Sequence, residues 1–260
     1  MSKSSEILVS ACSFGVPCEE IYVRKDYEKY GYRIEDLPFE FPNHEHWPKM
    51  LEDKLKTKVV NLSISGSGNY SICKRATDYI IKNHKKIKVC IISLSEWWRV
   101  EYSITMKRCE ESIEQPVHNK KEFYRKSVKN TLRSIYEFQM ICDRFKIPYM
   151  IFQMLPIYRE KAERRAPYIL EDDYFNLIDK KYCVGWPFTN YLGGYDFYKK
   201  HFSKNKLELC VGNMMAIRFD RKLQEPYLHK ILFDWHPNQK GHELICEKVI
   251  EQLMEHKLWK

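Results

Sequence analysis

Residues 6–15 read Glu6-Ile7-Leu8-Val9-Ser10-Ala11-Cys12-Ser13-Phe14-Gly15. The first half of this stretch is a short apolar run, which is typical of a strand buried on both faces of a parallel sheet. Small and polar residues follow at once, so Ser13 is placed just beyond the carboxyl end of that strand. Ligands of open α/β sheets bind at this end of the strands, and Ser13 is therefore a candidate site residue.

The rest of the chain alternates predicted strands with predicted helices. Further strands are indicated over 59–64, 89–94 and 149–154, and helices over 47–55, 70–83, 121–145 and 243–253. The first of these helices shows the usual spacing, with Trp47, Leu51 and Leu55 on one face. The alternation predicts a three-layer α/β/α sandwich around a central, mostly parallel sheet of about five strands. The fifth strand is expected near Leu207–Val211 or just before Asp234.

Length and composition bound the other properties. With 260 residues and no repeat or linker, we expect a single domain over 1–260 with insertions near 18–46, 100–120 and 156–230. The nine cysteines include no CxxC pair, and no signal peptide pattern is visible, which predicts reduced thiols and a cytoplasmic location, in the host cytoplasm if the protein is viral. No apolar run reaches the roughly 18 residues that a membrane span requires.

The formal net charge of +9 would attract anionic partners. The lysines are scattered, however, as in Lys82, Lys85, Lys86 and Lys88, and such a distribution is typical of a solvated surface. Nucleic-acid binding is therefore the weaker interpretation. The sequence does not define an oligomeric state.

Near the other end of the chain, residues 234–242 read Asp234-Trp235-His236-Pro237-Asn238-Gln239-Lys240-Gly241-His242. They place a carboxylate and an imidazole close together, on a predicted loop just before the C-terminal helix. An acid and a base need a nucleophile from elsewhere, and Ser13 supplies one. The three residue types predict a hydrolytic triad of Ser13, His236 and Asp234. Cys12 is a rival nucleophile, but strand alternation turns it away from the side of Ser13.

Polar residues also follow the second and third predicted strands. The turn Gly66-Ser67-Gly68-Asn69 comes after 59–64, and Ser95, Glu96 and Trp97 come after 89–94. In this order the residues resemble the SGNH hydrolase superfamily of GDSL-like lipases and esterases, particularly its divergent members from phages and environmental bacteria. The first family block, a strand ending in Gly-Asp-Ser, corresponds to Ala11-Cys12-Ser13. The second block supplies a glycine, matched by Gly66. The fifth block, Asp-x-x-His, is one residue tighter here.

The resemblance implies acyl transfer on small esters, including acetyl groups on glycans, without a cofactor. His236 would take the proton of Ser13, and Asp234 would hold the imidazole. The backbone N–H groups of Ser13 and Gly66 would bind the oxyanion. The asparagine of the third block is absent, and one such donor contributes about 3 kcal/mol in comparable sites. Asn69, or the hydroxyl of Ser95, could replace it.

Several alternatives stay open at this point. The missing asparagine favours a second class of function, a non-catalytic SGNH-fold binding or structural protein, for example in a virus particle. Asn69 could instead cap the helix that follows it. Trp97 could form a wall of a substrate cleft or pack beneath a lid over 100–120. His44-Glu45-His46 lacks further ligands at helical spacing, so no metal site is predicted.

Overall fold

The computed structural model describes residues 5–16, 45–95, 97, 120–154, 168–184, 210–220 and 225–259. Within these ranges, the side chains of residues 120, 121, 123, 124, 210–220 and 225–236 are not described. The predicted insertions near 18–46 and 100–120 therefore lie almost wholly outside the described residues. The one near 156–230 lies partly outside them.

The centre of the fold is a five-stranded sheet whose neighbouring strands are all parallel. Its strands are β1 (Glu6–Ser10), β2 (Val59–Asn61), β3 (Ile87–Leu94), β4 (Tyr149–Gln153) and β5 (Cys183–Val184). They lie in the order β2-β1-β3-β4-β5. This is the order of the flavodoxin-like doubly wound sheets, in which ligands bind at the carboxyl ends of the strands. The predicted parallel sheet of five strands is confirmed.

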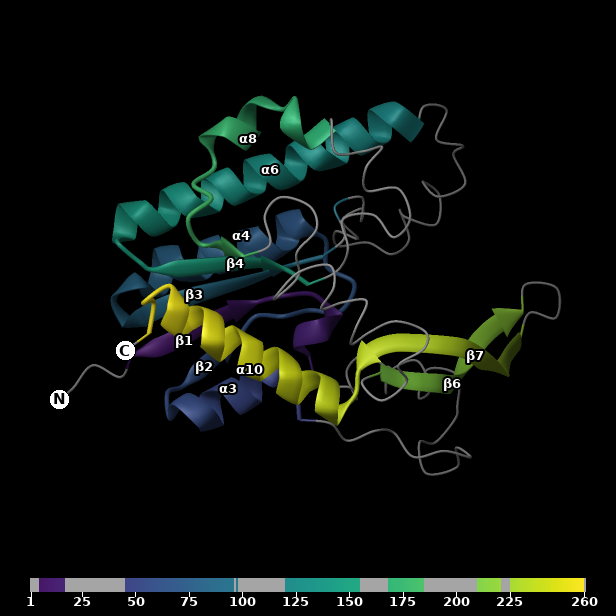
Figure 1. Ribbon diagram of the computed structural model, residues 1–260. Helices are drawn as coiled ribbons and strands as arrows, with labels where there is room; N and C mark the ends of the chain where they lie inside the picture. Colours follow the sequence, from purple (N-terminus) through teal and green to yellow (C-terminus); the bar gives the residue numbers. More distant parts are fainter. Residues whose placement is uncertain are drawn as a thin grey trace.

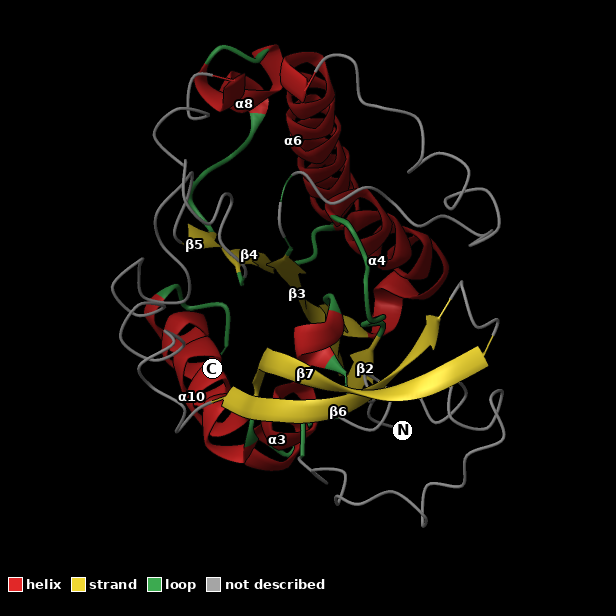
Figure 2. Cartoon of the chain, turned by 90° about the vertical axis from the view of Figure 1, so that its right-hand side faces the viewer, coloured by secondary structure: helices red, strands yellow, loops and turns green. Residues whose placement is uncertain are grey.

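Helices cover both faces of this sheet, as Figures 1 and 2 show. The helices α4 (Asn69–Asn83), α6 (Lys120–Phe145) and α8 (Asp173–Leu177) lie on one side, and α3 (Trp47–Leu55) and α10 (Gln239–Glu255) lie on the other. The arrangement confirms the predicted three-layer α/β/α sandwich. Every residue of β1 and β4 is buried, as expected for strands covered on both faces.

The amphipathic pattern of the long helix α6 explains how it attaches to the sheet. Its fully buried apolar residues recur every three or four positions and are Val128, Leu132, Ile135, Phe138 and Cys142.

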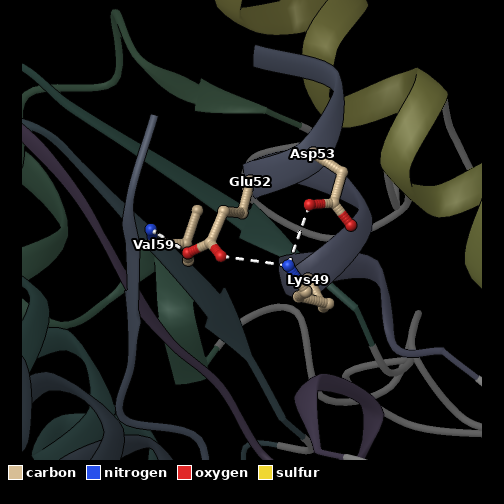
Figure 3. A network of polar contacts seen from close by, with 4 residues as sticks. All are labelled: Lys49, Glu52, Asp53 and Val59. Atoms are coloured by element: carbon tan, nitrogen blue, oxygen red, sulfur yellow. Dashed lines mark hydrogen bonds and ion pairs between the residues drawn. The ribbon is translucent and has the colours of Figure 1, made fainter. Parts of the chain in front are cut away.

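On the opposite side of the sheet, Glu52 joins the end of α3 to the start of β2, because its Oε2 accepts the backbone N–H of Val59 at 2.8 Å. Lys49 bonds both Glu52 and Asp53, and Figure 3 shows this network.

A second sheet departs from the sequence prediction. It consists of the antiparallel strands β6 (Cys210–Asp220) and β7 (Glu225–Pro237). Both places predicted for the fifth strand of the main sheet were wrong, because the described part of that sequence belongs to this hairpin. The fifth strand is Cys183–Val184, and a strand of two residues leaves no periodic pattern to read.

The expected loop around Asp234 and His236 was also wrong, since both residues lie within β7.

Three helices are followed by a lysine with a left-handed backbone conformation. Lys56, Lys146 and Lys257 follow α3, α6 and α10 within two residues, and each has a left-handed backbone with φ of 49°, 54° and 56°. Glycine is the usual residue in that conformation.

Candidate active site

Ser13 lies where the sequence predicted it, directly beyond β1. The residues Ser13–Gly15 form one turn of 3₁₀ helix, closed by a 2.9 Å hydrogen bond from Gly15 N to Cys12 O. Ser13 is only 4% exposed. Cys12 belongs to the hydrophobic core, so its thiol is enclosed by apolar side chains. That strand alternation turns Cys12 away from the side of Ser13 stays a prediction.

Four other thiols are unsuited to nucleophilic attack. Burial is the largest cause that raises the pKa of each one. The pKa of Cys246 is raised to about 11 and that of Cys183 to about 12, while Cys90 and Cys142 are shifted upwards as well. Because the thiolate is the reactive form, these residues stay protonated and unreactive near neutral pH.

Gly66 lies in an exposed turn that follows β2. Its φ is +77°, in the left-handed region that glycine adopts without strain. A Cβ at this position would have open space around it. The backbone conformation alone therefore accounts for glycine here, whether or not its N–H group binds a substrate.

Asn69 occupies the first position of α4, and its amide points to the end of β3. Its Oδ1 accepts the backbone N–H of Ser95 at 2.7 Å, and its Nδ2 donates to Ser95 O at 3.3 Å. A longer contact of 3.5 Å joins Nδ2 to Thr131 Oγ1. The helix N-cap is Gly68 and makes no side-chain cap hydrogen bond, so the alternative in which Asn69 caps α4 is wrong. A donor role toward an oxyanion stays a prediction.

The side chains after β3 are enclosed. Gln153 Nε2 donates to Ser95 O at 2.9 Å, and Trp97 Nε1 donates to Gln153 Oε1 at 2.8 Å. Ser95 is fully buried and Trp97 is 1% exposed, which favours packing over a role for Trp97 as the wall of an open cleft. Glu96 lies outside the described residues. Gln153 was not predicted as a site residue, although it lies at the carboxyl end of β4, where ligands of such sheets bind.

The strand that carries the predicted acid and base lies beside the predicted nucleophile. Residues of β7 come within 8 Å, measured between Cα atoms, of the Ser13–Gly15 turn. Figure 2 shows the β6–β7 hairpin crossing the carboxyl-end side of the main sheet. The side chains of Asp234 and His236 are not described, so their contacts with Ser13 stay a prediction.

The helix that follows β7 is well anchored. Asn238 is its N-cap, and the Asn238 side chain accepts the backbone N–H of Gly241 at 3.0 Å. This cap fixes where α10 begins and therefore where β7 must end. His242, in the first turn of α10, is buried.

Within the described ranges, no three His, Cys, Asp or Glu side chains gather in a way that could hold a metal ion. Burial is the main cause that lowers the pKa of His46, with a smaller contribution from the charge of Lys49. His44 lies outside the described residues. None of the described helices is both long and apolar enough to cross a membrane.

Comparison with known proteins gave structural similarities only. No protein-family model and no curated protein matches the chain. It is similar to the psychrotrophic esterase EstA from Pseudoalteromonas sp., at 12% identity and a TM-score of 0.45 over 96% of this chain and 97% of that one. A carbohydrate esterase gives 10% identity and a TM-score of 0.46 over 98% of this chain and 66% of that one. At these values the likeness assigns no residue of this chain a role.

Proposed function

We propose that the chain is an SGNH-type serine hydrolase that acts on small esters, O-acetyl groups on glycans among them. The observation that carries the proposal is the contact between β7 and the Ser13–Gly15 turn. Two segments more than 200 residues apart in sequence, each with triad residue types, meet at the carboxyl ends of a parallel sheet. Sites of doubly wound folds lie at this edge.

In the proposed reaction, Ser13 Oγ attacks the ester carbonyl while His236 accepts the hydroxyl proton. Asp234 holds the imidazole in the required tautomer and stabilises the imidazolium. The same proton passes to the departing alcohol, and an acyl ester of Ser13 remains. Water, activated by His236, then hydrolyses that ester and restores the serine.

The charge on the tetrahedral intermediate requires donors placed before the reaction begins. We assign this role to the backbone N–H groups of Ser13 and Gly66, with the Asn69 amide as the third candidate. Asn69 Nδ2 already donates to Ser95 O and Thr131 Oγ1, so it would have to give up one of these partners to bind the oxyanion.

Two observations favour a second function, a non-catalytic binding or structural protein with the same fold. Ser13 is only 4% exposed, and the position after β3 offers no asparagine. A binding protein could retain the fold and the buried serine without turnover. Activity measurements on a panel of short acyl esters separate the two functions.

The direct test compares ester hydrolysis by the wild type, Ser13→Ala and Ser65→Ala. Ser65 is an exposed serine in the neighbouring turn and serves as the matched control. We expect Ser13→Ala to abolish hydrolysis of p-nitrophenyl acetate and Ser65→Ala to retain it. Full activity of Ser13→Ala would overturn the nucleophile assignment, and an inactive wild type would favour the binding protein.

A further inference from the structure

Arg75 joins the chain beyond β1 to the chain beyond β2. From its place on α4, its Nε donates to Leu62 O at 2.8 Å and its Nη2 donates to Ala11 O at 3.1 Å. Ala11 comes shortly before Ser13, and Leu62 belongs to the segment that leads to Gly66. One guanidinium therefore binds the two segments that carry both proposed oxyanion donors.

Asn61 makes a second connection between the same segments. Its Nδ2 donates to Gly15 O at 2.7 Å, and its Oδ1 accepts the N–H of Ser63 at 3.1 Å. The backbone approach is also close, because a Cβ on Gly15 would lie 2.4 Å from Ser63 Oγ. The Ser13–Gly15 turn is thus held directly against the segment after β2.

These contacts go beyond what the sheet itself requires. Ala11 O already accepts the N–H of Ile64 at 3.2 Å, so the bond from Arg75 is a second one to a carbonyl that has a partner. Hydrogen bonds from a charged donor are shorter and stronger than neutral ones, and the planar guanidinium can reach two acceptors at a fixed angle. Such a group suits the task of setting the relative position of two loops.

We propose that Arg75 and Asn61 are positioning residues that form a strand-end clamp. The clamp fixes the Ser13–Gly15 turn relative to residues 62–66, so that the N–H groups of Ser13 and Gly66 are directed at the same substrate oxygen. The proposal rests on the proposed function and adds two residues that do not touch the reacting atoms. It predicts that loosening the clamp impairs the reaction step more than substrate binding.

The clamp itself is tested by amide hydrogen exchange on the whole chain. We compare the wild type with Arg75→Met and with Arg133→Met, a control that removes a half-exposed arginine paired with Glu137 on α6. In Arg75→Met, the amide hydrogens of residues 13–16 and 62–67 should exchange about tenfold faster, because these two segments open locally more often. The exchange rates of β3 and β4 should stay unchanged. Unchanged exchange in both segments, or an even rise across the sheet, would overturn the clamp.

The catalytic consequence is tested on a short acyl ester. Arg75→Met should lower kcat by about 10- to 100-fold while KM stays within about twofold, because small misplacements of reacting groups have effects of this size. Arg75→Lys should fall between it and the wild type, since an ammonium lacks the planar fork. Asn61→Asp should also lower kcat, because it removes the donor to Gly15 O.

The outcomes separate the two proposals. An active wild type with an equally active Arg75→Met enzyme would refute the positioning role and leave the proposed function intact. An inactive wild type would refute the proposed function, and hydrogen exchange would still decide whether the clamp exists. If Arg75→Met does not fold, Arg75→Lys and Asn61→Asp provide the same comparison.

Discussion

At the carboxyl ends of the central strands, polar side chains bind the backbone of the loops, whereas at the amino end of β1 they bind one another. The first group consists of Asn61, Asn69, Arg75 and Gln153. In the second, Glu6 accepts hydrogen bonds from Lys58 and Tyr79. Bonds to backbone fix the shape of a loop, while side-chain pairs mainly neutralise a charge. The contacts at the carboxyl ends hold the loops that would carry the proposed site, whereas those of Glu6 link β1 to the chain before β2 and to α4.

The largest effect is expected where the loops meet most closely. In Gly15→Ala the new Cβ would lie 2.4 Å from Ser63 Oγ and 2.8 Å from Ala11 Cβ, so the turn or these neighbouring residues must shift. We expect about 3 kcal/mol of lost stability in urea unfolding, the upper end of overpacking effects, together with lower kcat. Gly66→Ala is the control, because its Cβ has open space and meets only the strain of its φ. Equal stability of the two variants would contradict the close packing of the turn.

The next largest loss of stability is expected for Asn69→Ala. It removes the acceptor for the buried N–H of Ser95, and an unpaired buried group costs about 2 kcal/mol. The control is Asn83→Ala at the other end of α4, whose amide donates to Tyr79 O. Full stability of Asn69→Ala with a strongly reduced kcat would point to an oxyanion donor rather than a support for β3.

At the amino end of β1, the contribution of Glu6 to stability should depend on pH. The hydrogen bond from Lys58 is the largest cause that holds the pKa of Glu6 below its ordinary value; Tyr79 contributes in the same direction and burial opposes both. A carboxyl with a lowered folded-state pKa adds stability above its unfolded pKa of about 4.3 and loses it as the pH falls through the folded value. The stability advantage of the wild type over Glu6→Gln should therefore shrink on acidification from pH 6 to pH 3. A constant difference over that range would contradict the pairing.

The smallest effects are expected at the left-handed lysines that follow α3, α6 and α10. Lys56→Gly removes the strain of a side chain at φ 49°, and the gain is partly offset by the greater freedom of glycine in the unfolded chain. A stabilisation of less than about 1 kcal/mol is expected, with unchanged activity. Thermal unfolding of Lys56→Gly, Lys146→Gly and Lys257→Gly measures it, and a uniform loss of stability would show that the lysine side chains matter more than the backbone.

The sequence predicted those elements whose pattern is local. The range of α3 and the positions of β1, β3 and β4 followed from helical spacing and short apolar runs. The strand β5 was missed because Cys183–Val184 is too short to show a period. The hairpin was missed because the residues from 156 to 230, which include β6 and the first part of β7, show no clear period. Ser13 and Gly66 were predicted as site residues because each follows the carboxyl end of a strand. The same reasoning applies to Gln153.

The clamp illustrates what no local pattern could reveal. An arginine on a helix usually indicates a solvated face, and only the fold brings Arg75 to Ala11 and Leu62. The same holds for Gly15, whose lack of space depends on Ser63 in a different segment.

In the proposed mechanism, Ser13 is a nucleophile activated by His236. Reaction with a fluorophosphonate probe, followed by mass spectrometric mapping of the adduct, tests this mechanism most directly. We expect a single adduct on Ser13 in the wild type, its absence in Ser13→Ala, and a labelling rate at least about a hundredfold lower in His236→Gln, as expected for loss of a general base. An adduct on another residue, or none on the folded wild type, would contradict the mechanism.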